Sequence, residues 1–270
     1  MSSKAHKFFF EHKIFTFAQF AEAMANPVPT CRVMLNRHLK NGNIVHIKQG
    51  LYASIPSGAD AERYPIDPYA IISLLTEDSL IAYHTALQFH GIAYSVYFQH
   101  TFQSEEKIRD FQFRQDRFKV TKYPKSLPKS KYFIFSEEID HHGFIVRVTQ
   151  LERTLVDALD RINLSGGLEE VWRSLNNIQK VNVANIVEYA LLLGNATTIA
   201  KVGFYLRLRQ KEWKMEENYF SQLKAHLPRS VHYLDRKNRI NGKYIKEWRI
   251  VIPSELIGEQ WEEILDGSDI

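Results

Sequence analysis

The segment between Thr30 and Lys40 carries side chains that suit contacts to duplex DNA. Arginine forks onto guanine edges or phosphates and asparagine pairs with adenine, so Arg32, Asn36 and Arg37 are predicted to contact bases. Thr30 and Lys40, near the two ends of a predicted helix, are expected to bind phosphates. Two residues of a following turn would lie on the DNA backbone. The predicted contact set is Thr30, Arg32, Asn36, Arg37, Lys40, Lys48 and Gln49.

The most enzyme-like run spans Glu152 to Asp157, whose acids resemble the metal ligands of a nuclease. A structural interpretation is simpler. Thr149 and Glu152 have the spacing of a helix capping box, in which replacing Thr149 by Ala would cost about 1 kcal/mol. Arg153 and Asp157 have the i,i+4 spacing of a helical ion pair. We therefore predict that the chain is not an enzyme, and a nuclease or nucleotide-modifying enzyme is the alternative.

Other histidines and glycines lack the spacing that metal or phosphate binding requires. His84 and His90 are six residues apart and do not share a helical face. The pair His141-His142, beside Asp140, is predicted to be a solvated turn. The pair Gly166-Gly167 follows a predicted helix and precedes no lysine, so it is not a phosphate-binding loop. No metal and no cofactor is expected.

The elements that must position the DNA-contacting side chains fall within residues 1–57. A first helix is predicted at residues 4–13, and Thr16 and Gln19 form a capping box that opens a second. The prolines of residues 26–29 end the second helix and begin the third. A β-hairpin is predicted at residues 44–53. This order of elements is typical of a winged helix-turn-helix, which is the first predicted domain.

The distribution of charge favours the same segment. The chain has a net charge of +4. Residues 1–56 contain seven lysines and arginines and two acidic residues, whereas the rest contains 28 basic and 29 acidic residues. Because phosphate contacts supply most non-specific affinity for DNA, the basic segment is where a DNA footprint is expected. A solvated basic face without a ligand is the alternative interpretation.

A proline- and glycine-rich linker is predicted at residues 58–68, before a larger mixed α/β domain at residues 69–270. The overall class is therefore predicted to be α+β. Helices are predicted at residues 69–75, 80–91, 150–162, 168–177, 183–193, 197–214, 221–226 and 256–265. Strands are predicted at residues 96–102, 110–123, 131–135, 144–148, 231–234 and 244–252, the last two as a hairpin around Asn241-Gly242.

Cysteine count and hydropathy restrict the compartment. Cys31 is the only cysteine, which excludes an internal disulfide and a zinc site of paired cysteines. The N-terminal residues have no apolar run long enough for a signal peptide, and no segment approaches the roughly 20 apolar residues of a membrane span. A cytoplasmic protein without membrane contacts is expected.

Several runs resemble the AbiEi family of antitoxins and transcriptional regulators of type IV toxin–antitoxin systems. They are LNRHLKNGNIVHIKQGLYA (35–53), AYHTALQFHGI (82–92), TQLERTLVDAL (149–159), the Gly166-Gly167 pair and KVGFYL (201–206). The resemblance implies an N-terminal winged helix that binds inverted repeats in its own promoter. It also implies a C-terminal domain that neutralises a nucleotidyltransferase-like toxin without requiring direct contact. The wing of this family usually carries more arginine, whereas this chain has Lys48 and Gln49 there. The helix is therefore expected to make more of the DNA contacts than the wing.

The expectation from the sequence is a DNA-binding repressor that acts as an antitoxin in phage defence by abortive infection. Its partners would be double-stranded DNA of its own promoter and, functionally, the toxin, and copies of the chain would associate on the operator. A winged helix used only for protein contacts is the remaining alternative. It predicts negligible DNA affinity even at low salt.

Overall fold

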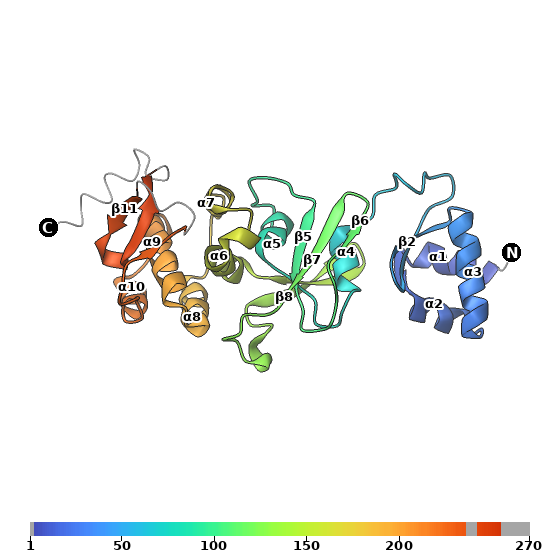
Figure 1. The fold of residues 1–270 in the computed structure, drawn as a ribbon, viewed down its shortest axis with the longest axis horizontal. Coiled ribbons are helices and arrows are strands. Elements are labelled where there is room, and N and C mark those ends of the chain that lie inside the picture. The colour runs from blue at the N-terminus through green and yellow to red at the C-terminus, as the bar shows by residue number, and fades with distance from the viewer. Residues whose placement is uncertain (1–2, 236–241, 255–270) are drawn as a thin grey trace. The chain divides into compact units, whose positions relative to one another are not determined.

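The computed structural model describes residues 3–235 and 242–254 and has the mixed α+β architecture expected from the sequence (Figure 1). The predicted turn at Asn241 and the predicted helix at residues 256–265 lie outside the described residues. Within the described part, no helix combines the length and apolar character that crossing a membrane requires.

The N-terminal 54 residues form three helices and a small sheet around their own hydrophobic core. Four phenylalanines, Phe8, Phe9, Phe15 and Phe20, are buried together with Leu35. The sheet has the order β1-β3-β2, with both pairs antiparallel. The elements are α1 (Ser3–Glu11), β1 (Ile14–Thr16), α2 (Phe17–Met24), α3 (Val28–Lys40), β2 (Ile44–Lys48) and β3 (Leu51–Ser54). Their order is the one predicted from the sequence.

Local signals explain where these helices begin and end. The predicted capping box of α2 is confirmed: the Gln19 backbone N–H donates to Thr16 Oγ1 at 3.2 Å, and the Thr16 N–H donates to Gln19 Oε1 at 2.7 Å. Helix α3 has Pro29 in its first turn, where a missing N–H costs no helical hydrogen bond. After α3, Gly42 takes a φ of 69°, which favours glycine.

A six-stranded mixed sheet follows, in the order β6-β7-β5-β4-β9-β8 (Figure 1). Strands β5 and β7 pair in parallel, whereas β4 with β5 and β6 with β7 pair antiparallel. Leu80, Ile81, Phe102 and Phe118 are fully buried in it. The elements are α4 (Pro68–Ser73), β4 (Leu80–Ile81), β5 (Gln99–Gln103), β6 (Phe111–Phe113), β7 (Asp116–Thr121), β8 (Ser136–His141) and β9 (Phe144–Thr149).

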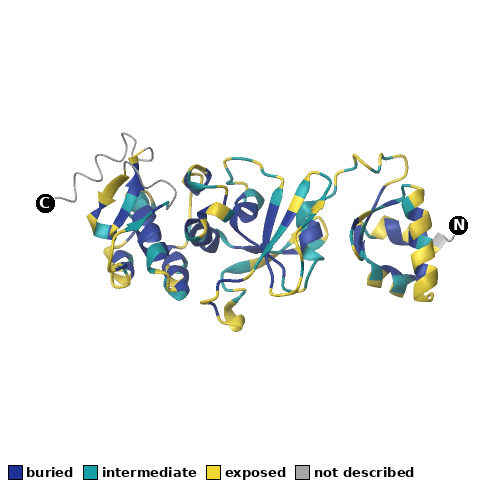
Figure 2. Cartoon of the chain, viewed as in Figure 1, coloured by how far each residue is buried: buried dark blue, intermediate teal, exposed yellow. Residues whose placement is uncertain are grey.

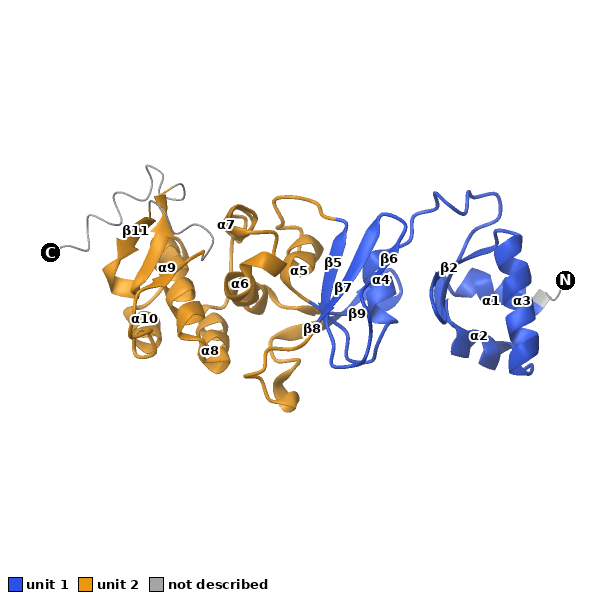
Figure 3. Ribbon diagram, in the orientation of Figure 1, with its two compact units in different colours: residues 1–81, 98–121, 138–147 blue, residues 82–97, 122–137, 148–270 orange. Residues whose placement is uncertain are grey.

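The chain divides into two compact units (Figure 3). Unit 1 is residues 1–81, 98–121 and 138–147, and unit 2 is residues 82–97, 122–137 and 148–270. These units do not coincide with the predicted division at residues 57, 58–68 and 69–270. Unit 1 joins the N-terminal segment and residues 58–81 with two later segments, because strands distant in sequence pair within one sheet.

Unit 2 is mainly helical, and one apolar core runs through it (Figure 2). Leu155, Leu159, Ile186, Tyr205 and Trp248 are among its fully buried residues. A three-stranded sheet in the order β10-β12-β11 completes the unit. The elements are α5 (Tyr83–Phe89), η1 (Lys129–Lys131), α6 (Leu151–Asp160), η2 (Ile162–Leu164), α7 (Leu168–Asn176), α8 (Val183–Leu193), α9 (Ala196–Trp213), α10 (Glu217–Lys224), β10 (His232–Tyr233), β11 (Gly242–Ile245), η3 (Lys246–Trp248) and β12 (Ile250–Pro253).

Three sequence-based predictions in this part were wrong. Residues 131–135 are not a strand: Lys131 ends η1, residues 132–135 are turns, and the strand begins at Ser136. Residues 80–81 are a short strand, so the predicted helix of 80–91 begins only at Tyr83. Strand β10 pairs in parallel with β12, whereas the sequence predicted an antiparallel hairpin of these segments. Strand β11 takes the antiparallel place beside β12. In the second and third cases, pairing with another strand overrode the local pattern.

Candidate functional site

Helix α3 separates its residues cleanly into a buried and an exposed face. Cys31, Leu35 and His38 are buried against the N-terminal core. The other face carries every residue of the helix that was predicted to contact DNA, and all of them are exposed (Figure 2): Thr30, Arg32, Asn36, Arg37 and Lys40. The separation follows from the helical period of 3.6 residues, which places positions three and four apart on one face.

The cations of this face lack ionic partners within the described residues. No described carboxylate forms an ion pair with Arg32, Arg37 or Lys40. The Arg32 guanidinium lies 5.9 Å from the centroid of the Phe17 ring, a weak contact at an exposed site. Burial, together with electrostatic repulsion from His6 and Arg37, lowers the pKa of His38 on the opposite face. The face therefore presents positive charge that the described residues do not neutralise.

Sequence reasoning missed one residue of this face. Val33 is 69% exposed although it is apolar. It lies three residues after Thr30 and three before Asn36, so it belongs to the same helical face. The signal was present in the sequence, because the buried positions Cys31 and Leu35 already fix which face points outward.

The two residues predicted to contact DNA from the β2–β3 turn differ in exposure. Gln49 is exposed at the tip. Lys48 is half-buried, and its Nζ lies 4.8 Å from the centroid of the Phe111 ring of β6. Burial lowers the pKa of Lys48. Of the predicted contacts, Lys48 thus makes a closer cation–π contact within unit 1 than Arg32 does.

The enzyme-like run in α6 is a buried structural cluster. Arg153 Nε lies 3.3 Å from Asp157 Oδ2, which confirms the predicted i,i+4 pair, and both side chains are inaccessible to solvent. Arg153 Nη1 also donates to the carbonyl oxygens of Tyr132 and Ile134, at 2.7 and 2.8 Å. The Tyr189 hydroxyl donates to Asp157 Oδ1 at 2.8 Å. Burial raises the pKa of Asp157, and Arg153 opposes that shift.

The predicted capping box before α6 is wrong. The N-cap is Gln150, and no side chain caps the helix. Thr149 Oγ1 instead bonds the hydroxyl of Thr154 at 2.7 Å in a buried position. Glu152 Oε1 accepts from the backbone N–H of Asn182 at 2.7 Å, which ties α6 to the start of α8. Neither side chain caps the helix, so the cost predicted for Thr149→Ala no longer rests on a cap.

A second buried cluster joins two runs that the sequence analysis singled out. His84 of α5 lies 3.0 Å from Glu170 Oε1 of α7, and its ring stacks on Tyr97 at 4.1 Å. Hydrogen bonds from Ser95, His84 and Ser174 outweigh the effect of burial and lower the pKa of Glu170. A Cβ on Gly166 would lie 2.5 Å from Glu170 Cγ. Gly166 is thus required by close packing, consistent with rejecting a phosphate loop.

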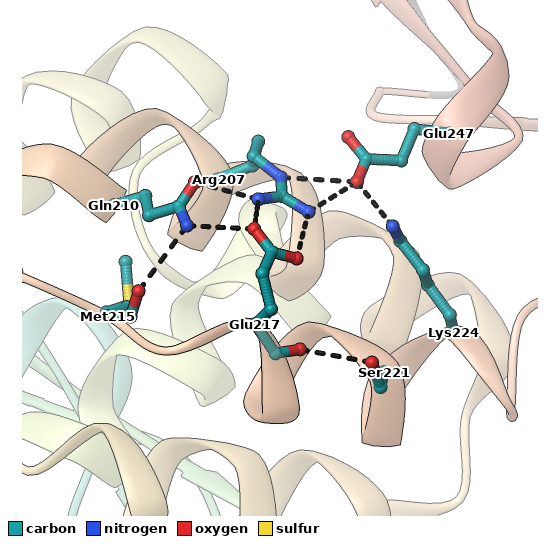
Figure 4. Close-up of polar contacts among 7 residues, drawn as sticks. All are labelled: Arg207, Gln210, Met215, Glu217, Ser221, Lys224 and Glu247. Carbon is teal, nitrogen blue, oxygen red and sulfur yellow. Dashed lines mark hydrogen bonds and ion pairs between the residues drawn. The ribbon is translucent and has the colours of Figure 1, made fainter. Parts of the chain in front are cut away.

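A third ionic cluster ties α9 to α10 and η3 (Figure 4). The Arg207 guanidinium contacts Glu217 and Glu247, each at 2.6 Å. Lys224 reaches Glu247 at 2.7 Å, and Gln210 donates to Glu217 at 2.9 Å. Hydrogen bonds from Arg207 and Gln210 lower the pKa of Glu217 to about 2. Every charged group drawn there has a partner of opposite sign, so the arrangement stabilises the fold.

One group of side chains among the described residues has the composition of a metal site. Asp67, His141 and His142 bring their ligand atoms within 4.8 Å of one another. The sequence placed the two histidines in a solvated turn beside Asp140, and the structure adds a carboxylate from a distant segment. His84 and His90 form no such group: His84 pairs with Glu170, and His90 Nε2 lies 2.7 Å from the Thr149 carbonyl oxygen.

Comparison with known proteins bears on the fold. No protein-family model matches the chain, and no curated protein matches it significantly. Among solved structures, the RV2827C protein from Mycobacterium tuberculosis is similar, with a TM-score of 0.64 and 12% sequence identity. The alignment covers 98% of this chain and 94% of that chain. At this identity the similarity shows that the two chains share an α+β fold across nearly their full length.

Proposed function

We propose that this protein is a DNA-binding transcriptional repressor whose residues 1–57 act as a winged helix-turn-helix. In this proposal α3 enters the major groove and the β2–β3 turn lies on the backbone. The proposal rests chiefly on one observation: Thr30, Arg32, Asn36, Arg37 and Lys40 are all exposed on one face of α3, and the described residues offer its three cations no ionic partner. The three-helix, three-stranded order of residues 3–54 supports it as well.

The roles within that face follow from side-chain chemistry. Arg32 and Arg37 would fork onto guanine edges, Asn36 would pair with adenine, and Val33 would contact a thymine methyl. Thr30, Lys40 and, at the turn, Lys48 and Gln49 would hold phosphates. Lys48 would first have to leave the Phe111 ring, so its contribution is expected to be the smallest of the cations.

Fluorescence anisotropy on a labelled duplex of the protein's own upstream region tests the proposal. Each of Arg32→Ala and Arg37→Ala should weaken specific binding by about 1–3 kcal/mol, or roughly 5- to 150-fold, and reduce discrimination against a scrambled duplex. The matched control is Arg173→Ala, which removes an exposed guanidinium from α7. Unchanged binding by both α3 variants rejects the helix assignment. Negligible binding by the wild type at low salt favours a protein-interaction module.

The second part of the proposal is that the chain acts as an antitoxin of a type IV, AbiE-like system in the cytoplasm. Its support is the resemblance of five sequence runs to the AbiEi family, given above. The toxin would be nucleotidyltransferase-like and would need no direct contact with this chain. Co-expression with the product of a neighbouring gene tests this: a toxic neighbour whose growth arrest the chain relieves is expected. If the chain relieves no growth arrest caused by a gene of its operon, the antitoxin role is rejected and the repressor role remains.

The nuclease alternative gains no support from the geometry. Asp157, its best candidate ligand, is fully buried between Arg153 and Tyr189. We propose that the protein is not an enzyme and that it binds its promoter, at inverted repeats, through neighbouring protomers.

A further inference from the structure

We propose that Asp67, His141 and His142 bind a divalent transition-metal ion, with zinc as the best fit. Two imidazoles and one carboxylate are ligands that zinc takes at about 2.0–2.2 Å, and three protein ligands leave a fourth position open. The three ligand atoms lie within 4.8 Å of one another. Asp67 precedes α4 as its N-cap, His141 ends β8 and His142 lies in the turn that follows, all within unit 1.

The Asp67 carboxylate is already oriented for this role. Its Oδ1 caps α4 by accepting from the backbone N–H groups of Tyr69 at 2.8 Å and Ala70 at 3.4 Å. Its Oδ2 faces His141 Nε2 at 2.7 Å. One carboxylate oxygen thus holds the side chain in place while the other is presented to the imidazole. A hydrogen-bonded ligand carboxylate of this kind is the usual supporting arrangement of metal sites.

The β8–β9 turn brings two adjacent histidines to the same side. Neighbouring side chains in an extended strand point to opposite faces. Here His142 has a φ of 56° and Gly143 a φ of 89°, and the His141 and His142 ring centroids lie 4.4 Å apart. The Asp140 carboxylate accepts from the Gly143 N–H at 2.8 Å, which fixes the turn. Positive φ at both central residues is the geometry of a common two-residue hairpin turn, and this turn places the two imidazoles next to each other.

Only small movements separate the present geometry from a tetrahedral site. Ligand atoms around a tetrahedral zinc ion lie about 3.3 Å apart. The 2.7 Å contact between Asp67 and His141 must therefore open slightly, and the His142 nitrogen must move inward. His142 is exposed, so its side chain is free to make that adjustment. The ion would replace the hydrogen bond between Asp67 and His141 and would join α4 to the β8–β9 turn.

Isothermal titration of zinc chloride into the full-length chain, without an affinity tag and after removal of metals by chelation, tests the proposal. One ion per chain is expected. His142→Ala should weaken zinc affinity at least about tenfold, and Asp67→Asn, which keeps the helix cap, should do the same. The control is His226→Ala, which removes an exposed histidine in unit 2 and should leave affinity unchanged.

A second readout distinguishes a site from surface adsorption. Cobalt bound to the wild type should give visible absorption typical of tetrahedral coordination, which His142→Ala should lose. Zinc should also raise the melting temperature of the wild type, because an ion that binds only the folded chain stabilises it. Absence of stoichiometric zinc uptake by the wild type overturns the proposal, as does equal affinity in His142→Ala or Asp67→Asn. Neither outcome depends on DNA binding.

Discussion

The arginines of α3 and those of unit 2 occupy opposite environments. Arg32 and Arg37 are exposed, and no described carboxylate pairs with them. Arg153 is fully buried against Asp157 and two carbonyl oxygens. Arg207 is 18% exposed and is held by two glutamates. Four side chains of one chemical type therefore divide into two that the fold pairs with carboxylates and two that the described residues leave without an ionic partner.

We therefore expect the two kinds of arginine to affect different measurements, namely the stability of the fold and the binding of a ligand. A buried charge that loses its partner costs the protein stability, because the remaining group stays desolvated and uncompensated. An exposed charge without a partner contributes little to stability and can be replaced at small cost. Variants in unit 2 should therefore change unfolding, whereas variants on α3 should change binding.

The largest expected effect is at the buried pair. Asp157→Asn should lower the free energy of unfolding by about 3 kcal/mol, because Arg153 keeps its charge and loses its counter-ion. Urea unfolding followed by circular dichroism measures this, and DNA affinity of the folded fraction should be unchanged. A loss below about 1 kcal/mol would mean that the pair is not the structural cluster described.

A close approach in α9 comes next. A Cβ on Gly203 would lie 2.1 Å from Cζ3 of Trp248, whose ring is fully buried. Gly203→Ala should therefore cost about 1–3 kcal/mol through overpacking, measured by the same urea titration. The control is Ser221→Ala, at an exposed position of α10. Gly58→Ala is unsuitable as a control, because a φ of 85° at Gly58 would strain an alanine. A tolerated Gly203→Ala would show that the Trp248 ring can shift.

On α3 the expected effect falls on selectivity. Val33→Ala should reduce the preference for the operator over a variant with thymine replaced by uracil, by about 1 kcal/mol or less, because a methyl contact is lost. The melting temperature should stay constant, since Val33 is 69% exposed. Anisotropy with the two duplexes measures the effect. Equal discrimination in wild type and variant would exclude Val33 from the interface.

The smallest effect concerns the surface part of the Arg207 cluster. Glu217→Gln should cost about 0.5 kcal/mol at neutral pH, because the Glu217 side chain is 65% exposed and solvent screens its ion pair. The pKa of Glu217 is lowered from 4.5 to about 2 in the folded chain. Its contribution is therefore present above pH 4.5 and is lost as the pH falls toward 2. Denaturation curves at pH 7 and pH 3 should differ less in the variant than in the wild type.

Much of the N-terminal segment could be predicted from the sequence. The capping box at Thr16, the prolines before α3, and the turn at Gln49-Gly50 are short-range signals, and the structure has each of them. The exposed face of α3 followed from the period of its apolar residues. The long helices of unit 2 were also predicted closely, because their apolar stripes repeat over many residues.

Other features required the tertiary structure. Thr149 and Glu152 satisfy a capping pattern, yet their oxygens bond Thr154 and Asn182 instead. The segments of β10 and β12 were predicted to pair, but as an antiparallel hairpin, whereas they pair in parallel. The Glu152–Asn182 contact and the β10–β12 pairing each join segments many residues apart, so local patterns alone did not predict them.

The sequence by itself determined the order of the N-terminal elements, the outward face of α3 and the concentration of positive charge in the first 56 residues, because each depends on residues a few positions apart. Only the tertiary structure decided that Asp67 meets His141, that His84 meets Glu170 and that Arg207 meets Glu247. Contacts of this kind depend on how distant segments pack to bury apolar surface. The spacing of neighbouring residues in the sequence does not predict that packing.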